Sequence, residues 1–270
     1  MSVATGELLG SVAVVTGASG RLGPVWIGAL LDAGATVIGL DVEGEPCPRL
    51  AEALLRRPGA RFTLTKADVT SRGSLIAALE HCQNSAGTPH ILVNNAGIDG
   101  PPAAGSGSWA FGDVPDVISA DILEVNANGT LRSCQVFGSA MAAAGRGSII
   151  NIGSLYGTVG PDPRLYDHIE LDPPFLKPPA YGMSKAGVAA LTRYLAVLWG
   201  PSGVRVNTLS PGGVRGDQDG VFTMKFESRV PLGRLAEPAD LAGPLVFLAG
   251  PAGRYVTGTE LLVDGGFVAL

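Results

Sequence analysis

Tyr181 and Lys185 are the two residues whose types and spacing most directly predict chemistry. Residues four apart share one face of a helix, so the lysine ammonium can lie beside the phenol. A free tyrosine has a pKa near 10 and is a poor base at neutral pH, but a nearby cation favours the phenolate. Lowering that pKa by about three units takes roughly 4 kcal/mol. The pair could therefore move a proton, although by itself this spacing is more often a surface pair.

A glycine-rich turn near the N-terminus predicts a nucleotide site. Gly17, Gly20 and Gly23 lie between a strand-like apolar run and a helical pattern, as the dinucleotide motif of a βαβ unit requires. Glycines let the backbone approach a pyrophosphate, and the N-terminus of the next helix offers free N–H groups. The residues expected to hold the phosphates are Gly17, Ser19, Gly20, Arg21, Leu22 and Gly23.

Asp41 indicates which dinucleotide binds. It ends the second strand-like run, 18 residues after Gly23, near the offset of about 20 residues expected for the ribose-binding acid. Its carboxylate can accept hydrogen bonds from ribose hydroxyls and would repel a 2′-phosphate, which favours NAD over NADP. Arg21 argues for NADP, because a cation near the phosphates could welcome a third one. We give Asp41 more weight, since its position is tied to the ribose.

The elements that must position these residues alternate between strands and helices, which predicts a doubly wound parallel sheet with helices on both faces. The expected strands are nearly all apolar, as in sheets that are covered on both sides. They are 12–15, 36–40, 62–66, 91–93, 148–152, 205–209 and 261–263. The expected helices are 22–33, 50–57, 71–85, 118–144, 181–200 and 238–248. We expect residues 1–270 to form a single domain of this α/β, Rossmann type.

Composition excludes several classes of protein. The net charge is −5 and no Lys/Arg-rich run occurs, so nucleic acid is not an expected partner. No segment approaches the ~20 apolar residues of a membrane span, and the first ten residues do not form a secretory signal. The three cysteines, Cys47, Cys82 and Cys134, have no metal-binding spacing, so we expect no metal site, reduced thiols and a cytoplasmic location.

Taken together, the motifs resemble the short-chain dehydrogenase/reductase family, in its short single-domain branch. The resemblance covers essentially the whole chain and is carried by Thr16–Gly23, Asp68-Val69, Asn94–Gly97, Asn126, Ser154, Tyr181–Lys185, Pro211–Gly213 and Val256–Gly266. One departure is Arg21, which stands where the short branch has its middle glycine. The spacing of glycines 17, 20 and 23 is closer to the epimerase-type branch, whose larger C-terminal domain this chain is too short to contain.

The resemblance implies an NAD(H)-dependent oxidoreductase that interconverts a secondary alcohol and a ketone. It implies that Tyr181 exchanges a proton with the substrate oxygen, that Lys185 binds the nicotinamide ribose and lowers the pKa of the tyrosine, that Ser154 hydrogen-bonds the substrate oxygen, and that Asn126 holds a relay water. It implies further cofactor contacts from Asp68 and Val69 at the adenine, from Asn95, Ala96 and Gly97 along the path to the nicotinamide, and from Pro211, Gly212, Gly213 and Val214 at the nicotinamide end.

Two loops are expected to wall the substrate pocket. Residues 157–180 form a proline-rich insertion between Ser154 and Tyr181, and residues 215–230 follow the nicotinamide contacts; an outward excursion of the insertion is the alternative. The candidate substrate residues are Tyr156, Arg164, His168, Arg215 and Gln218. The insertion and the segment Ser-Pro-Gly-Gly-Val resemble family members that act on sugars or polyols, so we expect a sugar-like or cyclic polyol.

Other functions and an oligomeric state also follow as expectations. The alternatives are reduction of a hydrophobic ketone, an NAD-dependent sugar epimerase and a non-catalytic NAD(H) sensor. The apolar end, residues 260–270, resembles a segment through which relatives assemble, and this predicts a homotetramer or dimer. The alternative is that this segment forms only a last strand and an ordered tail within one chain.

Overall fold

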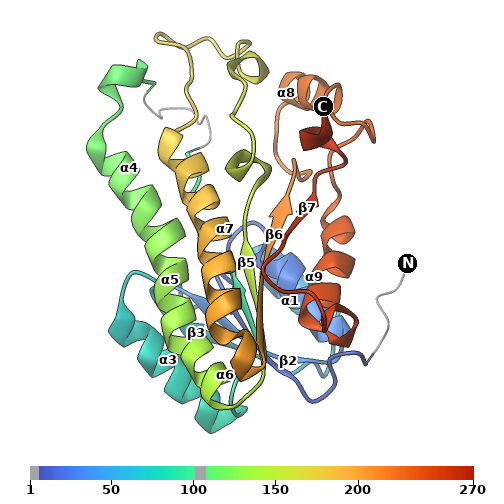
Figure 1. The fold of residues 1–270 in the computed structure, drawn as a ribbon. Helices are drawn as coiled ribbons and strands as arrows, with labels where there is room; N and C mark the ends of the chain where they lie inside the picture. The colour runs from blue at the N-terminus through green and yellow to red at the C-terminus, as the bar shows by residue number, and fades with distance from the viewer. Residues whose placement is uncertain (1–5, 101–107) are drawn as a thin grey trace.

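The computed structural model describes residues 6–100 and 108–270, and part of the glycine- and proline-rich segment 98–115 lies outside them. Seven parallel strands form one sheet in the order β3-β2-β1-β4-β5-β6-β7. This confirms the predicted doubly wound fold, in which the arrow of β6 points upward in Figure 1. Their bounds are β1 Val12–Thr16, β2 Thr36–Asp41, β3 Phe62–Lys66, β4 Ile91–Asn94, β5 Gly147–Ile152, β6 Val204–Pro211 and β7 Glu260–Val263.

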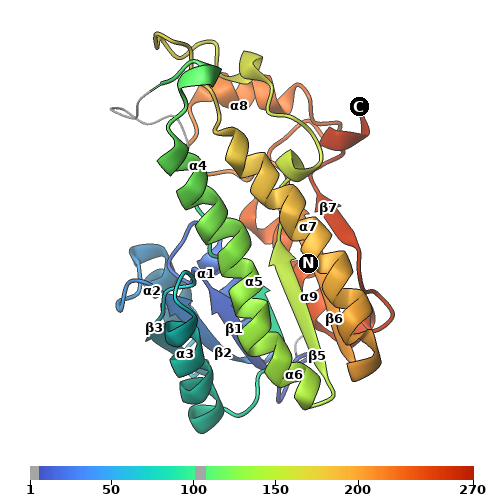
Figure 2. The same cartoon turned by 60° about the vertical axis from the view of Figure 1, so that its left-hand side comes forward.

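Helices cover both faces of the sheet (Figures 1 and 2). One face is covered by α1 (Gly23–Asp32), α2 (Pro48–Leu55) and α9 (Ala242–Ala249), which share an apolar core that contains the buried Trp26. The other is covered by α3 (Arg72–Ser85), by the helical run from 116 to 143, and by α7 (Pro179–Trp199), around a second core that contains Phe137. The fold therefore has three layers.

The long helix predicted over 118–144 is one rod with two irregular turns. α4 (Asp116–Leu123), α5 (Gly129–Ser133) and α6 (Ser139–Ala143) are joined by π-helical turns at Glu124–Asn128 and Cys134–Gly138. Such turns are often found at functional sites. The first of them contains Asn126, one of the predicted site residues.

The strand register brings the chain segments of interest to one edge of the sheet. Thr16 pairs with Leu40 and with Asn94, so Gly17, Asp41 and Asn95 leave the sheet at the same level. β2 and β3 are added to the sheet on one side of β1, and β4 to β7 are added on the other side. The order of the strands therefore reverses between β1 and β4. In doubly wound sheets this reversal, beyond the carboxyl ends of the strands, is where ligands bind.

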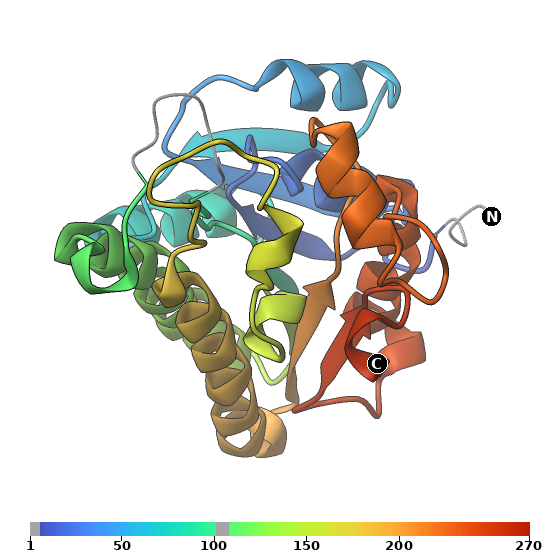
Figure 3. The same cartoon turned by 90° about the horizontal axis from the view of Figure 1, so that it is seen from above.

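A cap lies above this edge, and part of it was not predicted. Residues 215–230, expected to be a loop, contain the helix α8 (Gly220–Glu227), whose first turn is capped by the side chain of Asp219. In Figure 3, which looks down on the edge, α8 and the segment 157–178 flank the strand ends. A third apolar cluster, with Tyr166, Phe175 and Phe226 at its centre, packs the two segments together.

Candidate active site

The glycine turn after β1 is locked to the end of β4. Gly17 has a φ of +65°, and a Cβ at this position would lie 2.8 Å from the Cα of Ala96. The Asn95 side chain donates a hydrogen bond to the carbonyl of Gly17 (2.8 Å) and accepts one from the indole of Trp26 (2.8 Å). At Gly17 the backbone is therefore held against the end of β4 and has no room for a side chain. That is what close approach of a pyrophosphate requires.

Two cavities meet at this turn. One, of about 570 Å³, is lined by Ser19, Asp41, Asp68 and Val69. The other, of about 670 Å³, is lined by the catalytic candidates and by Pro211, Gly212, Gly213 and Val214. Both are lined by Gly17, Gly20, Ala96 and Gly97, so they form one continuous trough. A trough in two compartments that share a glycine turn fits a dinucleotide.

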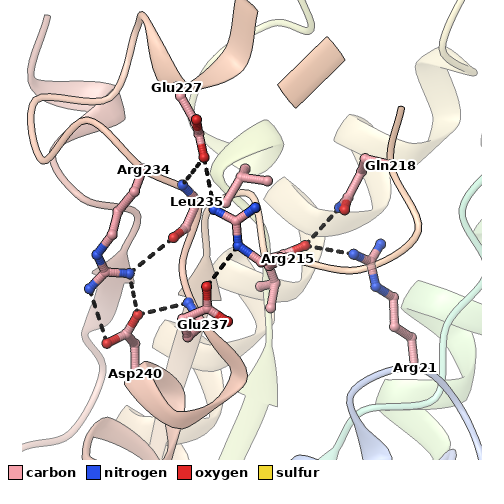
Figure 4. A network of polar contacts seen from close by, with 9 residues as sticks. Arg21, Arg215, Gln218, Glu227, Arg234, Leu235, Glu237 and Asp240 are labelled. Atoms are coloured by element: carbon pink, nitrogen blue, oxygen red, sulfur yellow. Dashed lines mark hydrogen bonds and ion pairs between the residues drawn. The ribbon is translucent and has the colours of Figure 1, made fainter. Parts of the chain in front are cut away.

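Asp41 and Arg21 lie on opposite sides of the turn. The Asp41 carboxylate accepts hydrogen bonds from the backbone N–H groups of Ser19 (2.8 Å) and Glu43 (3.2 Å), and it lines the smaller cavity. Arg21 lines the larger cavity, where its guanidinium donates to the carbonyl of Val214 (2.6 Å; Figure 4). Among the described residues that line the smaller cavity none is a lysine or an arginine.

The helix α7 positions Tyr181 and Lys185 against the end of β5. Both side chains line the larger cavity together with Ser154. The Lys185 ammonium donates to the carbonyl of Ile152 (2.9 Å) and lies 5.7 Å from the centre of the Tyr181 ring. A Cβ on Gly97 would lie 3.7 Å from the same ammonium nitrogen. The predicted catalytic residues and the nicotinamide path thus come together.

The surroundings of Tyr181 raise its pKa, whereas the sequence predicted a lowered one. Burial, followed by the charge of Asp99, raises the pKa of Tyr181 above its usual value. A side-chain hydrogen bond with Ser154 and the charge of Arg21 act in the opposite direction on that pKa. Burial also lowers the pKa of Lys185 to about 8. The net shift of the Tyr181 pKa is therefore upward, and the lowering by Lys185 that the family resemblance implies stays a prediction.

Asn126 is held by contacts within the protein. Its side-chain amide accepts a hydrogen bond from the N–H of Ile98 (2.8 Å) and donates to the carbonyl of Ile98 (2.9 Å) and to Ser184 Oγ (3.1 Å). The amide thereby ties the segment after β4 to α7, next to Lys185. The water relay implied by the family resemblance stays a prediction.

The candidate substrate residues separate into two groups. Tyr156 and Gln218 line the larger cavity, and Gln218 also donates to the carbonyl of Val214 (2.7 Å). Arg164, His168 and Arg215 are not among its lining residues.

Each of these three pairs with acidic side chains, of which only Asp219, the partner of His168, lines the larger cavity. Arg215 bonds Glu237 (2.7 Å) and Glu227 (3.0 Å), as Figure 4 shows. Arg164 pairs with Asp162 and is 78% exposed, and His168 lies 2.9 Å from Asp219. The sequence reveals the cations but not the carboxylates that they meet after folding.

Several lining residues were not among the candidate substrate residues, although those from the insertion lie in a segment expected to wall the pocket. Lys177, Tyr166 and Ile169 come from the insertion, and Asp99 follows the Asn-Ala-Gly turn. Asp99 and Lys177 form an ion pair across 78 residues of sequence. The proline-flanked lysine just ahead of α7 was the one available signal, because a cation so close to the start of that helix must lie near Tyr181.

Two tests for other kinds of site are negative over 6–100 and 108–270. No three His, Cys, Asp or Glu side chains of this part lie where they could bind one metal ion. No helix in it has the length and apolar character needed to span a bilayer.

Comparison with known proteins identifies the family. The family model for short chain dehydrogenases matches residues 11–165, and that for enoyl-(acyl carrier protein) reductase matches residues 173–268. A galactitol 2-dehydrogenase (L-tagatose-forming) of Cereibacter sphaeroides is 35% identical, over 97% of this chain and 96% of its own. A D-threitol dehydrogenase of Mycolicibacterium smegmatis is 34% identical, over 97% and 94%.

Two further similar proteins are a steroid dehydrogenase and a dehydrogenase of known structure. A 3-alpha-(or 20-beta)-hydroxysteroid dehydrogenase of Mycobacterium bovis is 34% identical, over 98% of this chain and 92% of its own. The crystal structure of a short chain dehydrogenase from Leptospira borgpetersenii with bound NAD+ superimposes with a TM-score of 0.84 at 33% identity, covering 99% of this chain and 97% of that one. This chain belongs to the short-chain dehydrogenase family and is an oxidoreductase that acts on CH–OH groups with a nicotinamide cofactor.

Proposed function

We propose that this protein is an NAD-dependent dehydrogenase that interconverts a secondary alcohol of a sugar-like or cyclic polyol and the corresponding ketone. The observation that carries the proposal is the meeting of Ser154, Tyr181 and Lys185 in one cavity that continues past Gly17 into a second cavity beside Asp41. Asp68 and Val69 would lie at the adenine, and residues 95–97 and 211–214 along the nicotinamide half.

The protein's own share of the reaction is the proton and the charge on the reacting oxygen. The bound nicotinamide supplies the acceptor or donor of the hydride. Tyr181 takes the proton of the alcohol, Ser154 hydrogen-bonds the same oxygen, and the Lys185 ammonium favours the phenolate. The hydrogen bond with Ser154 acts against the burial that raises the pKa of Tyr181. Each pKa unit gained corresponds to ~1.4 kcal/mol.

Tyr181→Phe tests this assignment. The substitution keeps the ring and removes the hydroxyl, so we expect kcat for alcohol oxidation to fall by roughly 10²- to 10⁴-fold, the range of a general base. Binding of NAD, followed by calorimetry, should stay close to wild type. An unchanged kcat with every alcohol tested would contradict the mechanism.

The proposed preference for NAD rests on the charged side chains on the two sides of the glycine turn. Asp41 offers a carboxylate where the adenosine ribose would lie, with Glu43 and Glu45 near it. Arg21 is engaged by the carbonyl of Val214 in the other cavity, so it does not offset this negative charge. A 2′-phosphate would meet like charges there, which is unfavourable.

The substrate class is supported by the lining of the larger cavity. Polar side chains at Tyr156, Gln218 and Lys177 give a polyhydroxylated substrate several hydrogen-bonding partners. The similar galactitol and D-threitol dehydrogenases act, by their names, on open-chain polyols.

A hydrophobic ketone is the second candidate, because Tyr166, Ile169 and Phe222 also line the cavity. A panel of polyols, cyclic diols and steroid alcohols, followed by NADH formation, separates the two: turnover of steroids alone would refute the polyol proposal.

Two functions without net redox change were also expected as alternatives. An epimerase would use NAD without consuming it, and a sensor would bind NAD without turnover. Steady formation of NADH from NAD and an alcohol excludes both, and its absence with the whole panel would favour them.

We further propose a homo-oligomer, a tetramer or dimer, in a reducing cytoplasmic compartment. Exposed apolar side chains gather on α7 at Met183, Tyr194, Val197 and Leu198, and large exposed apolar patches often mark interfaces. The C-terminal segment itself packs inward, since Phe267 stacks on Phe226 at 4.8 Å. All three cysteines are free. Light scattering of the eluting protein tests the assembly, and a monomer would contradict it.

A further inference from the structure

Lys177 is a buried cation in the wall of the larger cavity. It lies two residues before α7, and its side chain is only 6% exposed. Its ammonium nitrogen lies 4.9 Å from the centre of the Tyr181 ring and 5.7 Å from that of Tyr156. No step of the mechanism above uses this charge, yet it is close to Tyr181, the residue proposed to take the proton of the substrate hydroxyl.

A buried ammonium is costly unless its charge is paired and its hydrogens are bonded. Asp99 supplies the charge partner, and it is the one hydrogen-bond acceptor that the described residues give to Lys177. An ammonium has three donors, so donors remain for a ligand in the cavity that Lys177 lines. The hydroxyl of Tyr156, in the same wall, is also buried without a partner among the described residues.

The charge balance of the cavity indicates a neutral ligand group. Three cationic and three acidic side chains line it, so no net charge selects an anion. They are Arg21, Lys177, Lys185, Asp99, Asp217 and Asp219. A hydroxyl accepts a hydrogen bond from an ammonium without needing a net positive site.

We propose that Lys177, held by Asp99, is a specificity-determining residue that donates a hydrogen bond to the hydroxyl on the carbon next to the reacting carbon. The protein thereby selects vicinal diols over simple secondary alcohols. This inference rests on the proposed function and names the substrate group that Lys177 recognises.

Lys177→Met tests the inference with a matched substrate pair, 1,2-cyclohexanediol and cyclohexanol. We expect kcat/KM for the diol to fall by roughly 10- to 100-fold, the usual effect of losing a hydrogen bond to a charged group. For cyclohexanol it should change less than about threefold, because that substrate lacks the second hydroxyl. Arg193→Met, which removes an exposed cation further along α7, is the control and should leave both values unchanged.

A double variant separates substrate binding from an electrostatic effect on Tyr181. Lys177→Met leaves Asp99 unpaired, and the Asp99 charge acts on Tyr181. In Lys177→Met/Asp99→Asn this charge is gone, so a restored preference for the diol would overturn the proposal. Equal losses for both substrates in the single variant, with a displaced pH profile, would overturn it too. A loss confined to the diol in both variants supports it.

Failure of the proposed function gives a different result. If the wild type forms no NADH with any alcohol, the redox assignment fails, while calorimetry of the NAD complex with the two cyclohexane compounds still decides the role of Lys177. Tighter binding of the diol to wild type, lost in Lys177→Met, supports the inference. Equal affinities in wild type contradict it.

Discussion

Tyr181 is surrounded by groups with opposing effects on its acidity. Burial and the carboxylate of Asp99 raise its pKa, whereas the hydrogen bond with Ser154 and the charge of Arg21 lower it. Lys185 sits beside the ring with a pKa of about 8, so a substantial part of it remains protonated near neutral pH. The pH dependence of the reaction should therefore respond to single charges in the cavity.

Asp99→Asn should move the pH profile toward lower pH. The Asp99 charge raises the pKa of Tyr181, so its removal lowers that pKa. The phenolate is then populated at lower pH, and the acidic limb of kcat/KM for alcohol oxidation shifts in the same direction. Asp113→Asn, at an exposed turn outside the cavity, is the control. A limb that stays in place or moves to higher pH would contradict this explanation.

Asp41→Ala should weaken the preference for NAD. The substitution removes the carboxylate that would face a 2′-phosphate, and contacts between like charges cost several kcal/mol. The ratio of kcat/KM with NAD to that with NADP should fall by roughly 10- to 100-fold. Steady-state kinetics with both cofactors and one alcohol measure it. An unchanged ratio would mean that the ribose does not lie at Asp41.

At the scale of elements, the insertion and α8 are joined by aromatic contacts and ion pairs. Tyr166 packs on Phe222, with ring centres 5.4 Å apart, and Lys225 pairs with Asp167. Asp162 binds two arginines: Arg164, its neighbour in the insertion, and Arg229, which follows α8. Only the second of these pairs links the two segments.

Arg229→Met and Arg164→Met form a matched pair of variants. Both remove one arginine from Asp162, but only Arg229→Met removes a contact between the insertion and the region of α8. We expect Arg229→Met to raise KM for the alcohol several-fold and to speed proteolysis within 157–178, while Arg164→Met leaves both near wild type, since exposed local pairs contribute little. Equal behaviour of the two variants would show that the pair of Arg229 and Asp162 does not hold the cap in place.

Prediction from the sequence succeeded where local pattern is sufficient. The run Val12–Val15 is apolar throughout because it is covered on both faces, and the structure extends it by only one residue. The helix α8 was missed because its short sequence, Gly220–Glu227, shows little amphipathic pattern, and because its aromatic residues face a cluster built from the distant insertion. The partner of Lys177 was hidden for the same reason, because Asp99 lies 78 residues away in the sequence.

At the scale of the whole molecule, the cofactor should stabilise the fold. A ligand at about a hundred times its Kd adds about 2.7 kcal/mol to the free energy of unfolding. For a chain of this size each kcal/mol raises Tm by about 2–4 °C, so NAD should raise Tm by roughly 5–10 °C. NADP at the same concentration should give a smaller rise in a thermal melt. Equal rises would contradict the proposed cofactor preference.

The cap that walls the larger cavity belongs to no strand of the sheet. Its residues come from 157–178 and from the region of α8, whereas Tyr181, Ser154 and the glycine turn are fixed by α7 and by the ends of β5 and β1. New substrate ranges can therefore evolve by exchanging two surface segments while the redox chemistry is inherited intact. Grafting both segments together into a related enzyme should transplant selectivity, whereas one alone would lose its packing partner.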